Sequence, residues 1–535
     1  MSHGDNGEYA QRERARRLGR FGRENLAVTE SSRLAATLGG LSLATDLVAG
    51  LPSETALRTA TLAGQIGREL GLTASAVSDV FYAALLRFVG CSAFAHETAA
   101  LGGGQDQALL RSLTPTDAAR PRSVFLHAGR GMGRRRARVL VNVVTHPSTP
   151  LALARAHCDL ATQLAARLGA SENVVTALGQ IFERWDGKGA PNGLRGDALS
   201  LTARVLHAAF RAETHRALLG TEQASEVVRE RRGSELEPRV ADACSRALSV
   251  SFTGKSSVWQ RFLEAEPAPF RRFEATDTER VALAFAHYVD LKSPYTLGHS
   301  TQVAALARRV ATELGLPPRE QDELGHAALL HDLGKVGVPN GVLDKPGPLD
   351  VHEWDQVRQH AHDTRRILER APTLAPLALL AASDHERLDG QGYPRSAPAS
   401  ALSAAARVLA ACDSFSAMRE ERAYRPALSE ADARQELTAA ARAGRLDLRS
   451  VEALLATTGA RSRKVARAWP AGLTDREVEV LTLVARGLSN KEVGRRLFIS
   501  PRTVQHHLEH AFEKTGARSR AALAVYVVSH DLVEK

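Results

Sequence analysis

An internal repeat constrains this chain's fold more than any other feature. The segment TALRTATLAGQIGRELGL, which starts at Thr55, aligns without a gap with HSTQVAALARRVATELGL, which starts at His299. Further along, FERWDGKGAP (182–191) aligns with HERLDGQGYP (385–394). The first copy carries extra residues between these blocks, including GGGQ and GRGMGRRRAR, which we expect to form a surface loop. Because the apolar residues recur at helical spacing, the repeat predicts two copies of one helical domain.

Length and composition predict an ordinary globular protein with several domains. A chain of 535 residues is too long for one core, and 44% hydrophobic with 24% charged residues is typical of soluble folds. The sequence lacks an apolar run near the roughly 20 residues of a membrane span, and its polar start does not resemble a signal peptide. We therefore expect a cytoplasmic protein without a membrane partner. Its four cysteines form no CxxC pair, and we expect buried, reduced thiols.

The predicted fold class is all-α, in six segments. A net charge of +10 permits a polyanionic partner, and of three arginine-rich runs only 461–467 adjoins a plausible DNA-binding unit. The expected segments are a polar tail (1–33), a degenerate first domain (34–250), a linker (251–274), a metal-bearing domain (275–458), a basic linker (459–472) and a DNA-binding domain (473–535).

The second copy offers seven metal-ligand side chains. Divalent transition metals bind imidazole and carboxylate ligands, and an aspartate beside a histidine can bridge two ions. Such ions make bound water nucleophilic near neutral pH, and hydrolysis of a phosphate ester is the natural use. The seven residues are His299, His331, Asp332, His360, Asp384, His385 and Asp413.

The first copy has lost these ligand-type residues at all but one aligned position. Only His157, opposite His360, is retained. Three of the replacements are phenylalanine, which would refill a lost metal site with apolar packing. We therefore expect no metal in the first copy. The replacements are Thr55, Arg87, Phe88, Ile181, Phe182 and Phe210.

The second copy resembles the HD-GYP family of HD-superfamily phosphohydrolases. The resemblance rests on YTLGHS, HDLGKVGVP, KPGPL, HERLDGQGYP and ERAYRP, in that order. It implies cleavage of cyclic di-GMP at a centre of two, or in some members three, iron or manganese ions. It also implies that Asp332 bridges the ions and that Lys335 lies beside the scissile phosphate. Tyr393, Arg422 and Arg425 fall at positions that help bind the substrate.

The chain departs from the family pattern at two positions. The family usually has two consecutive histidines where this chain has Asp384 and His385, and it often has a second aspartate where Ser416 stands. Because a carboxylate also binds iron or manganese, Asp384 is compatible with a retained site. It is equally compatible with an early step of decay.

The last 63 residues predict a helix-turn-helix unit. Ser489 and Glu492 form a capping-box pattern at the start of one short helix. Ser500 and Pro501 are typical of the N-cap and first position of the next, which we expect to run to about Lys514. Short helices with a tight central turn are typical of DNA-binding domains, although a protein-protein module is the alternative.

This segment resembles the LuxR-type DNA-binding domain through LTDREVEVL, GLSNKEV, LFISPRTVQHHL and KTGARSR. The resemblance implies that the helix starting at Pro501 enters the major groove and that the final helix pairs two domains, as in a homodimer. The implied base-reading residues are Arg502, Thr503, Gln505 and His506. The implied phosphate contacts are Lys491, Arg495 and Lys514.

Together these features predict a transcription regulator whose metal domain binds and hydrolyses a cyclic dinucleotide, cyclic di-GMP above others. Two alternatives remain open. One is a transcription factor that senses the nucleotide without hydrolysing it. The other is a phosphohydrolase of another nucleotide.

Overall fold

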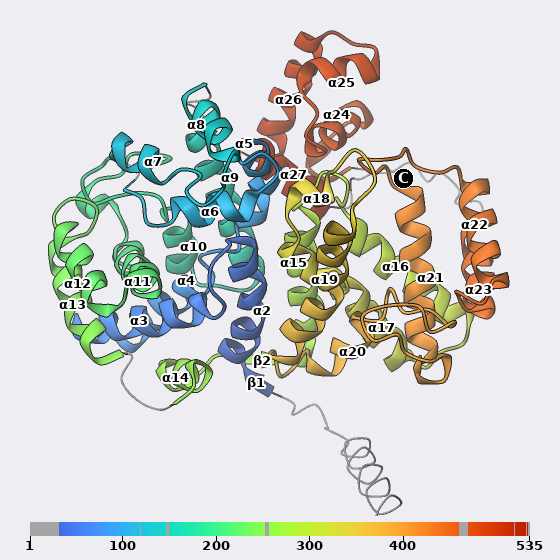
Figure 1. Ribbon diagram of the computed structural model, residues 1–535, viewed down its shortest axis with the longest axis horizontal. Helices are drawn as coiled ribbons and strands as arrows, with labels where there is room; N and C mark the ends of the chain where they lie inside the picture. Colours follow the sequence, from blue (N-terminus) through green and yellow to red (C-terminus); the bar gives the residue numbers. More distant parts are fainter. Residues whose placement is uncertain are drawn as a thin grey trace, which may run out of the picture.

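The computed structural model describes residues 31–117, 119–145, 149–251, 256–459, 469–517, 519–530 and 532. Within these ranges the protein is helical except for two three-residue strands, as the all-α prediction requires. Two helical lobes lie side by side, and a third, smaller helical unit lies above the boundary between them (Figure 1).

The first lobe corresponds to the first copy of the repeat. Its helical elements are α2 (Leu34–Val48), α3 (Thr55–Glu69), α4 (Ala74–Leu85), η1 (Cys91–Phe94), α5 (Ala95–Leu101), α6 (Asp106–Leu113), α7 (Pro121–His127), α8 (Arg135–Thr145), α9 (Thr149–Arg167), α10 (Glu172–Leu178), η2 (Gly196–Ala198), α11 (Leu201–Leu219), α12 (Thr221–Glu230) and α13 (Pro238–Ser251). The arginine-rich segment that we expected to be a loop thus contributes Arg135 onward to α8.

The second lobe repeats the main helices of the first. Its helical elements are η3 (Ala275–Asp277), α15 (Thr278–Asp290), α16 (His299–Glu313), α17 (Pro318–Leu330), η4 (Leu333–Gly337), α18 (Asn340–Leu343), α19 (Val351–Glu369), η5 (Ala375–Leu377), α20 (Ala378–Ala381), η6 (Ala399–Ala401), α21 (Ala404–Arg419), α22 (Glu430–Arg442) and α23 (Leu448–Gly459). Helix α16 begins 244 residues after α3, and α21 begins 203 residues after α11, at the two offsets of the sequence repeat. The structure therefore confirms the duplication.

The two copies share one apolar core. Helix α2 of the first copy packs on η4 and α19 of the second, and α15 packs on η1 and α9 of the first. Strands β1 (Ser31–Arg33) and β2 (Arg272–Glu274) precede α2 and α15 and pair antiparallel, with Ser32 opposite Phe273. The buried apolar side chains of both copies form one continuous cluster. Chain length alone suggested a core for each domain, but the two copies have one core in common.

Two segments expected to be unstructured carry structure. Residues 31–33, assigned to the tail, form β1, whereas residues 1–30 lie outside the described residues. The expected linker 251–274 contains β2 and α14 (Val258–Ala265). Phe262 of α14 is buried and stacks on Phe81 with ring centroids 5.2 Å apart. The sequence pattern missed this helix because its eight residues are too few to show a helical period.

The third unit comprises η7 (Pro470–Gly472), α24 (Asp475–Ala485), α25 (Asn490–Leu497), α26 (Pro501–Thr515) and α27 (Arg520–Ser529). The predicted caps are present: Ser489 and Glu492 form a capping box, and the Ser500 hydroxyl accepts from the Thr503 backbone amide. A separate apolar core holds this unit together. Across the described ranges, none of the helices has the length and apolar character that a membrane span requires.

Candidate metal centre

The helices of the second copy bring all seven predicted metal ligands into one buried cluster. His299 is the first residue of α16, and His331 and Asp332 lie between α17 and η4. His360 belongs to α19, Asp384 and His385 follow α20, and Asp413 belongs to α21. Six of the seven residues are buried, and the side chain of His385 is 25% exposed. This exposure places the open side of the cluster at His385.

The cluster divides into two groups that aspartates bridge. The ligand atoms of His299, His331 and Asp332 lie within 4.8 Å of one another, as do those of His360, Asp384 and His385. Asp332 Oδ1 lies 3.3 Å from His331 Nε2 and 3.8 Å from His360 Nε2, so it faces both groups. Asp413 likewise faces both: its Oδ1 is 3.1 Å from His299 Nε2, and its Oδ2 is 3.9 Å from His385 Nδ1. Both aspartates therefore lie between the two groups of histidines.

Buried ligand atoms without hydrogen-bond partners indicate that the site fits metal ions. The Nδ1 atoms of His331 and His360 donate to the carbonyl oxygens of Ala328 and Val357 at 2.7 and 2.5 Å. Each ring therefore turns its Nε2 toward the cluster, where it finds no hydrogen-bond partner. Because a buried polar atom without a partner is costly, these nitrogens need an additional ligand in the site.

Asp384, the departure from the family pattern, occupies a ligand position. Its carboxylate is fully buried, with Oδ2 3.1 Å from His385 Nε2 and 3.8 Å from His360 Nε2. Neither oxygen accepts a hydrogen bond. A buried, unpaired carboxylate is strongly unfavourable, whereas a carboxylate bound to a cation is not. The geometry of Asp384 therefore favours a retained metal site.

Carboxylates dominate the electrostatics of the cluster. Burial lowers the pKa of His299, but Glu420, Asp413 and Asp332 outweigh it and raise that pKa to about 10. Burial also lowers the pKa of His331, but Asp332 and Asp413 outweigh it and raise that pKa to about 9. The pocket has an excess of negative charge, as a cation site requires.

The four predicted catalytic and substrate residues have different partners. Lys335 Nζ lies 2.5 Å from Asp332 Oδ2, and the Tyr393 ring stacks on His385 with centroids 4.7 Å apart. Arg422 donates to Glu420 Oε2 at 2.7 Å. Arg425 instead donates to backbone carbonyls of residues 417, 418, 420 and 426. These bonds give Arg425 a structural task at the end of α21, and its contact with substrate stays a prediction.

Sequence reasoning missed Glu420. Its Oε1 lies 2.8 Å from His299 Nδ1, and this bond orients the ring so that Nε2 faces the cluster. Glu420 is one of several acids that follow α21, and it belongs to none of the motifs that revealed the site. Its separation of 121 residues from His299 gave no local signal.

Sequence reasoning also missed the residues of the first copy that reach toward the site. Asp106 forms a buried ion pair with Lys292 at 3.0 Å and accepts from the Asn340 backbone amide at 3.0 Å. Gln107 donates to the Val336 carbonyl at 3.1 Å. Val336 follows Lys335 in η4. The first copy therefore supports the segment that carries the predicted catalytic lysine.

The centre of the first copy is filled by side chains. Phe88 and Phe210 meet edge to face with centroids 5.5 Å apart, and the Arg87 guanidinium lies 3.9 Å from the Phe210 ring centre. His157 Nε2 donates to the Arg87 carbonyl at 3.0 Å, and the His157 ring meets Phe182 edge to face at 5.1 Å. This packing matches the expected refilling, and the metal-free state of this copy remains a prediction.

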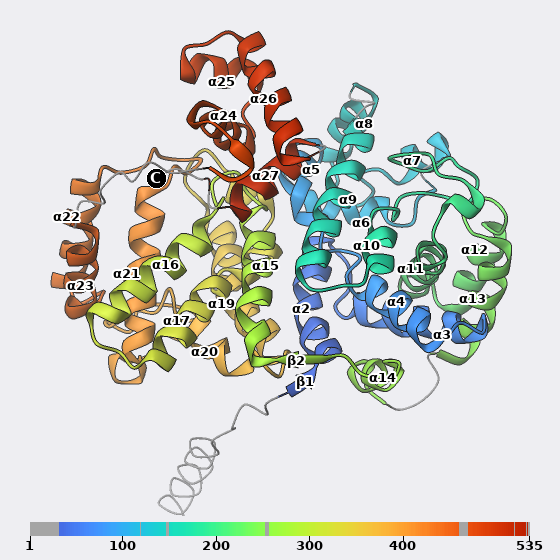
Figure 2. The same ribbon diagram turned by 180° about the vertical axis from the view of Figure 1, so that it is seen from behind.

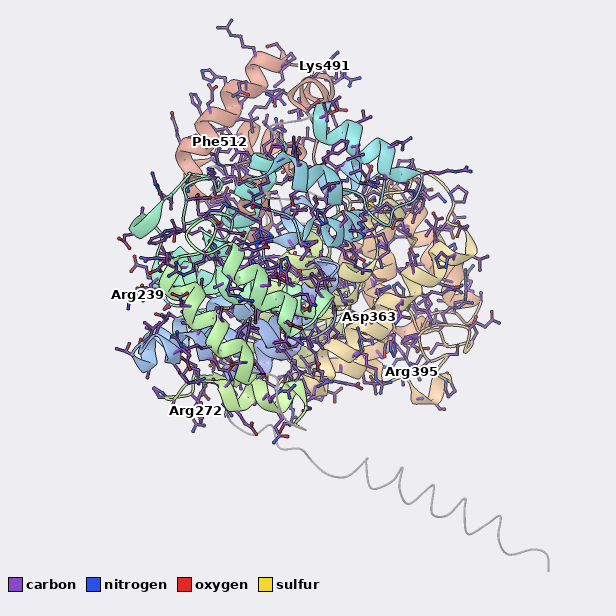
Figure 3. All side chains as sticks on the ribbon, turned by 60° about the vertical axis from the view of Figure 1, so that its left-hand side comes forward. Arg239, Arg272, Asp363, Arg395, Lys491 and Phe512 are labelled. Carbon is purple, nitrogen blue, oxygen red and sulfur yellow. The ribbon has the colours of Figure 1, made fainter. Side chains whose placement is uncertain are left out.

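In the C-terminal unit, the predicted DNA-reading residues are exposed along α25 and the start of α26. Lys491 lies at the end of the unit farthest from the two lobes (Figure 3). Gln505 accepts from Asn490 Nδ2 at 2.9 Å, and His506 packs on His510 with centroids 4.2 Å apart. Lys514 lies 2.7 Å from Glu477 Oε2, an ion pair that a DNA phosphate would have to replace. Arg495, Arg502 and Thr503 complete the exposed set.

Comparisons with known proteins agree with this geometry. A family model described as HD domain matches residues 147–240 and 284–449, and one described as bacterial regulatory proteins, luxR family, matches 471–527. The 3'3'-cGAMP-specific phosphodiesterase 3 of Vibrio cholerae is 30% identical over 399 residues, which cover 72% of this chain and 86% of that protein. A match of this length extends into the first copy.

Two further relatives support the same grouping. The cyclic di-GMP phosphodiesterase response regulator RpfG of Xanthomonas campestris pv. campestris is 32% identical over 225 residues, 41% of this chain and 59% of that protein. A crystal structure described as a cyclic GMP-AMP specific phosphodiesterase of V. cholerae covers 81% of this chain and 99% of its own, with 26% identity and a TM-score of 0.56.

Proposed function

This chain belongs to the HD-GYP family of metal-dependent phosphohydrolases, and we propose that it is a transcription regulator whose second copy hydrolyses a cyclic dinucleotide. The observation that carries the proposal is the buried cluster of four histidines and three aspartates with unpartnered ligand atoms. The luxR-family domain at 471–527 supplies the DNA-binding half. A DNA-binding regulator of this kind works in the cytoplasm.

The protein residues around the cluster suit a cyclic dinucleotide. When bound, the ions supply Lewis-acid activation of the phosphate and of water. In this proposal Lys335, which lies beside Asp332, neutralises charge on the scissile phosphate, and Arg422, which pairs with Glu420, binds the second phosphate. The Tyr393 ring, stacked on His385, offers an aromatic face to a base.

Two substrates are candidates. The resemblance to the HD-GYP family, and relatives such as RpfG that are named for cyclic di-GMP, favour that nucleotide. The V. cholerae relative that matches 72% of this chain is named for 3'3'-cGAMP, which favours that nucleotide as the second candidate. Both carry two phosphodiester bonds and differ in one base, so the metal centre treats them alike, and base contacts decide between them.

Metal content and product analysis on the full-length protein test the enzymatic proposal. We expect at least two iron or manganese ions per chain and a linear product from cyclic di-GMP or 3'3'-cGAMP, with cyclic di-AMP as the comparison nucleotide. His360→Ala should lower both metal content and turnover, whereas His157→Ala, the matched change in the first copy, should leave the metal content unchanged. Metal without turnover of any of these nucleotides favours the sensor alternative; absence of metal contradicts the proposal.

DNA contacts are tested separately. Arg502→Ala or Gln505→Ala should cost roughly 1 to 3 kcal/mol of binding and change the sequence preference, because these side chains would read bases. Lys491→Ala should weaken binding to all duplexes alike and lower the salt slope by about 1. Salt-independent binding, or no binding to any duplex, favours the protein-protein module.

A further inference from the structure

The DNA-binding domain rests on the seam between the two copies. Helix α27 contacts α9 of the first copy and α15 of the second, and both ribbon views place it there (Figures 1 and 2). Val525 is fully buried and belongs to the apolar core of the two lobes. Leu523 and Val527 belong to the core of the DNA-binding domain. Helix α27 is thus apolar on two faces, and each face packs into a different core.

Few polar contacts accompany this packing. Ser519 Oγ donates to Asp159 Oδ2 of α9 at 2.6 Å. Arg496 of α25 lies 3.4 Å from Glu421, and both side chains of this pair are about half exposed. An exposed ion pair stabilises a contact only weakly, and burial of the Val525 side chain contributes more. The described contacts therefore suit a docked state that can open.

Adjacent residues connect this docking surface to the metal centre. Glu420 accepts from His299, a predicted ligand, and from Arg422. Glu421, the next residue, faces Arg496 of the DNA-binding domain. A substrate phosphate that binds Arg422 competes with Glu420 for the guanidinium. Glu420 and Glu421 share a peptide bond, so a backbone displacement at Glu420 also moves Glu421.

We propose that the α9–α15 seam is a docking surface for α27, and that nucleotide in the metal-bearing copy loosens the docking so that the Val525 face can pair with a second copy of this chain. The nucleotide step rests on the proposed function. A docked chain presents one recognition helix, whereas a two-fold operator needs two. Docking therefore holds the regulator in a form that binds such an operator weakly.

A reversible disulfide lock between α27 and α9 tests the docking directly. In the full-length double variant Ser519→Cys with Asp159→Cys, an oxidant should join α27 to α9, since the native side chains are in hydrogen-bond contact. The four native cysteines are buried, so they should not react. The probe is the duplex that wild-type protein enriches from a random-sequence pool. We expect the oxidised variant to be monomeric and to bind this duplex roughly 5- to 150-fold more weakly than after reduction. Ser519→Cys alone is the control and should not respond to the oxidant.

A second experiment tests whether nucleotide bound at the metal centre loosens the docking of α27. Added cyclic di-GMP or 3'3'-cGAMP should raise the DNA affinity of the reduced double variant but not of the oxidised one. The Arg422→Ala change should remove this response. Equal DNA binding in the oxidised and reduced forms overturns the docking proposal, and an unchanged affinity with either nucleotide overturns the nucleotide step.

Hydrolysis measured on the same samples separates the two proposals. If the lock controls DNA binding and no nucleotide is hydrolysed, the docking stands and the enzymatic proposal fails. If the nucleotide is hydrolysed and the lock has no effect on DNA binding, the enzymatic proposal stands and the docking fails.

Discussion

The two copies have matching helices but different centres. In the second copy Asp332, Asp384 and Asp413 face histidines, and carboxylates raise the pKa of His331 to about 9. In the described part of the first copy no carboxylate pairs with His157, and burial lowers its pKa to about 3. The difference teaches that the fold depends on the shared apolar helix faces, while ligand-type residues at a few positions decide whether the centre attracts cations.

The first copy compensates for its lost ligands with a cation of its own. Arg87, at the position of His331, lies over the Phe210 ring and donates to the Ile181 carbonyl at 3.3 Å. Burial lowers its pKa to about 9, so it is still charged at neutral pH. A fixed guanidinium thus stands where the second copy has a ligand-type side chain.

The largest expected effect comes from replacing Asp332, which lies between the two groups of ligand-type residues. Asp332→Ala should reduce hydrolysis to background and lower the metal content, because Asp332 faces both ligand groups. The matched change in the first copy, Phe88→Leu, should leave hydrolysis near the wild-type rate at a cost of roughly 1 kcal/mol in stability. Initial rates with saturating manganese and metal analysis check both. Equal losses of hydrolysis and metal content in the two variants would contradict the assignment of the metal centre to the second copy.

A smaller effect is expected at the outer partner of His299. Glu420→Gln should lower metal affinity or activity by about 10- to 100-fold, as is typical for groups that orient a ligating histidine. The glutamine keeps the size of the side chain and can still accept from His299, so folding should be preserved. Titration with manganese during turnover measures the change. The corresponding position of the first copy holds Ala217, and Ala217→Ser should change neither quantity.

Sequence could predict the repeat, the helical class and the clustering of seven ligand-type residues, because those residues lie in ordered motifs whose spacing survives in both copies. That these residues bind metal stays a prediction. It could not predict Glu420, Asp106 or Gln107, whose partners lie more than 100 residues away. The shared core was also hidden, since apolar periodicity shows which face of a helix is buried but not against which helix it packs. Residue roles at the DNA remain predictions.

The dependence of the second copy on the first is testable at Gln107. Gln107→Ala removes the bond to the Val336 carbonyl and should slow turnover several-fold by loosening Lys335, with little change in KM. Gln105→Ala, in the same turn, is the control. Rescue by Gln107→Asn would be partial because the shorter amide reaches less far. An unchanged kcat would show that Lys335 is held by the second copy alone.

The smallest expected effect is a pH dependence of the free energy of unfolding that originates in the first copy. In the first copy burial raises the pKa of Glu235, but Arg211, Arg231 and Arg184 outweigh it and hold that pKa at about 2, against 4.5 for a free glutamate. Since the folded-state pKa is depressed, the stabilisation is complete above about pH 4.5 and is lost as the pH falls toward 2. The shift corresponds to about 3 kcal/mol. Between pH 6 and pH 3 the free energy of unfolding should therefore fall more steeply for wild type than for Glu235→Gln. Denaturant unfolding at fixed metal concentration measures both curves, and parallel curves would show that the ion cluster around Glu235 contributes nothing to acid sensitivity.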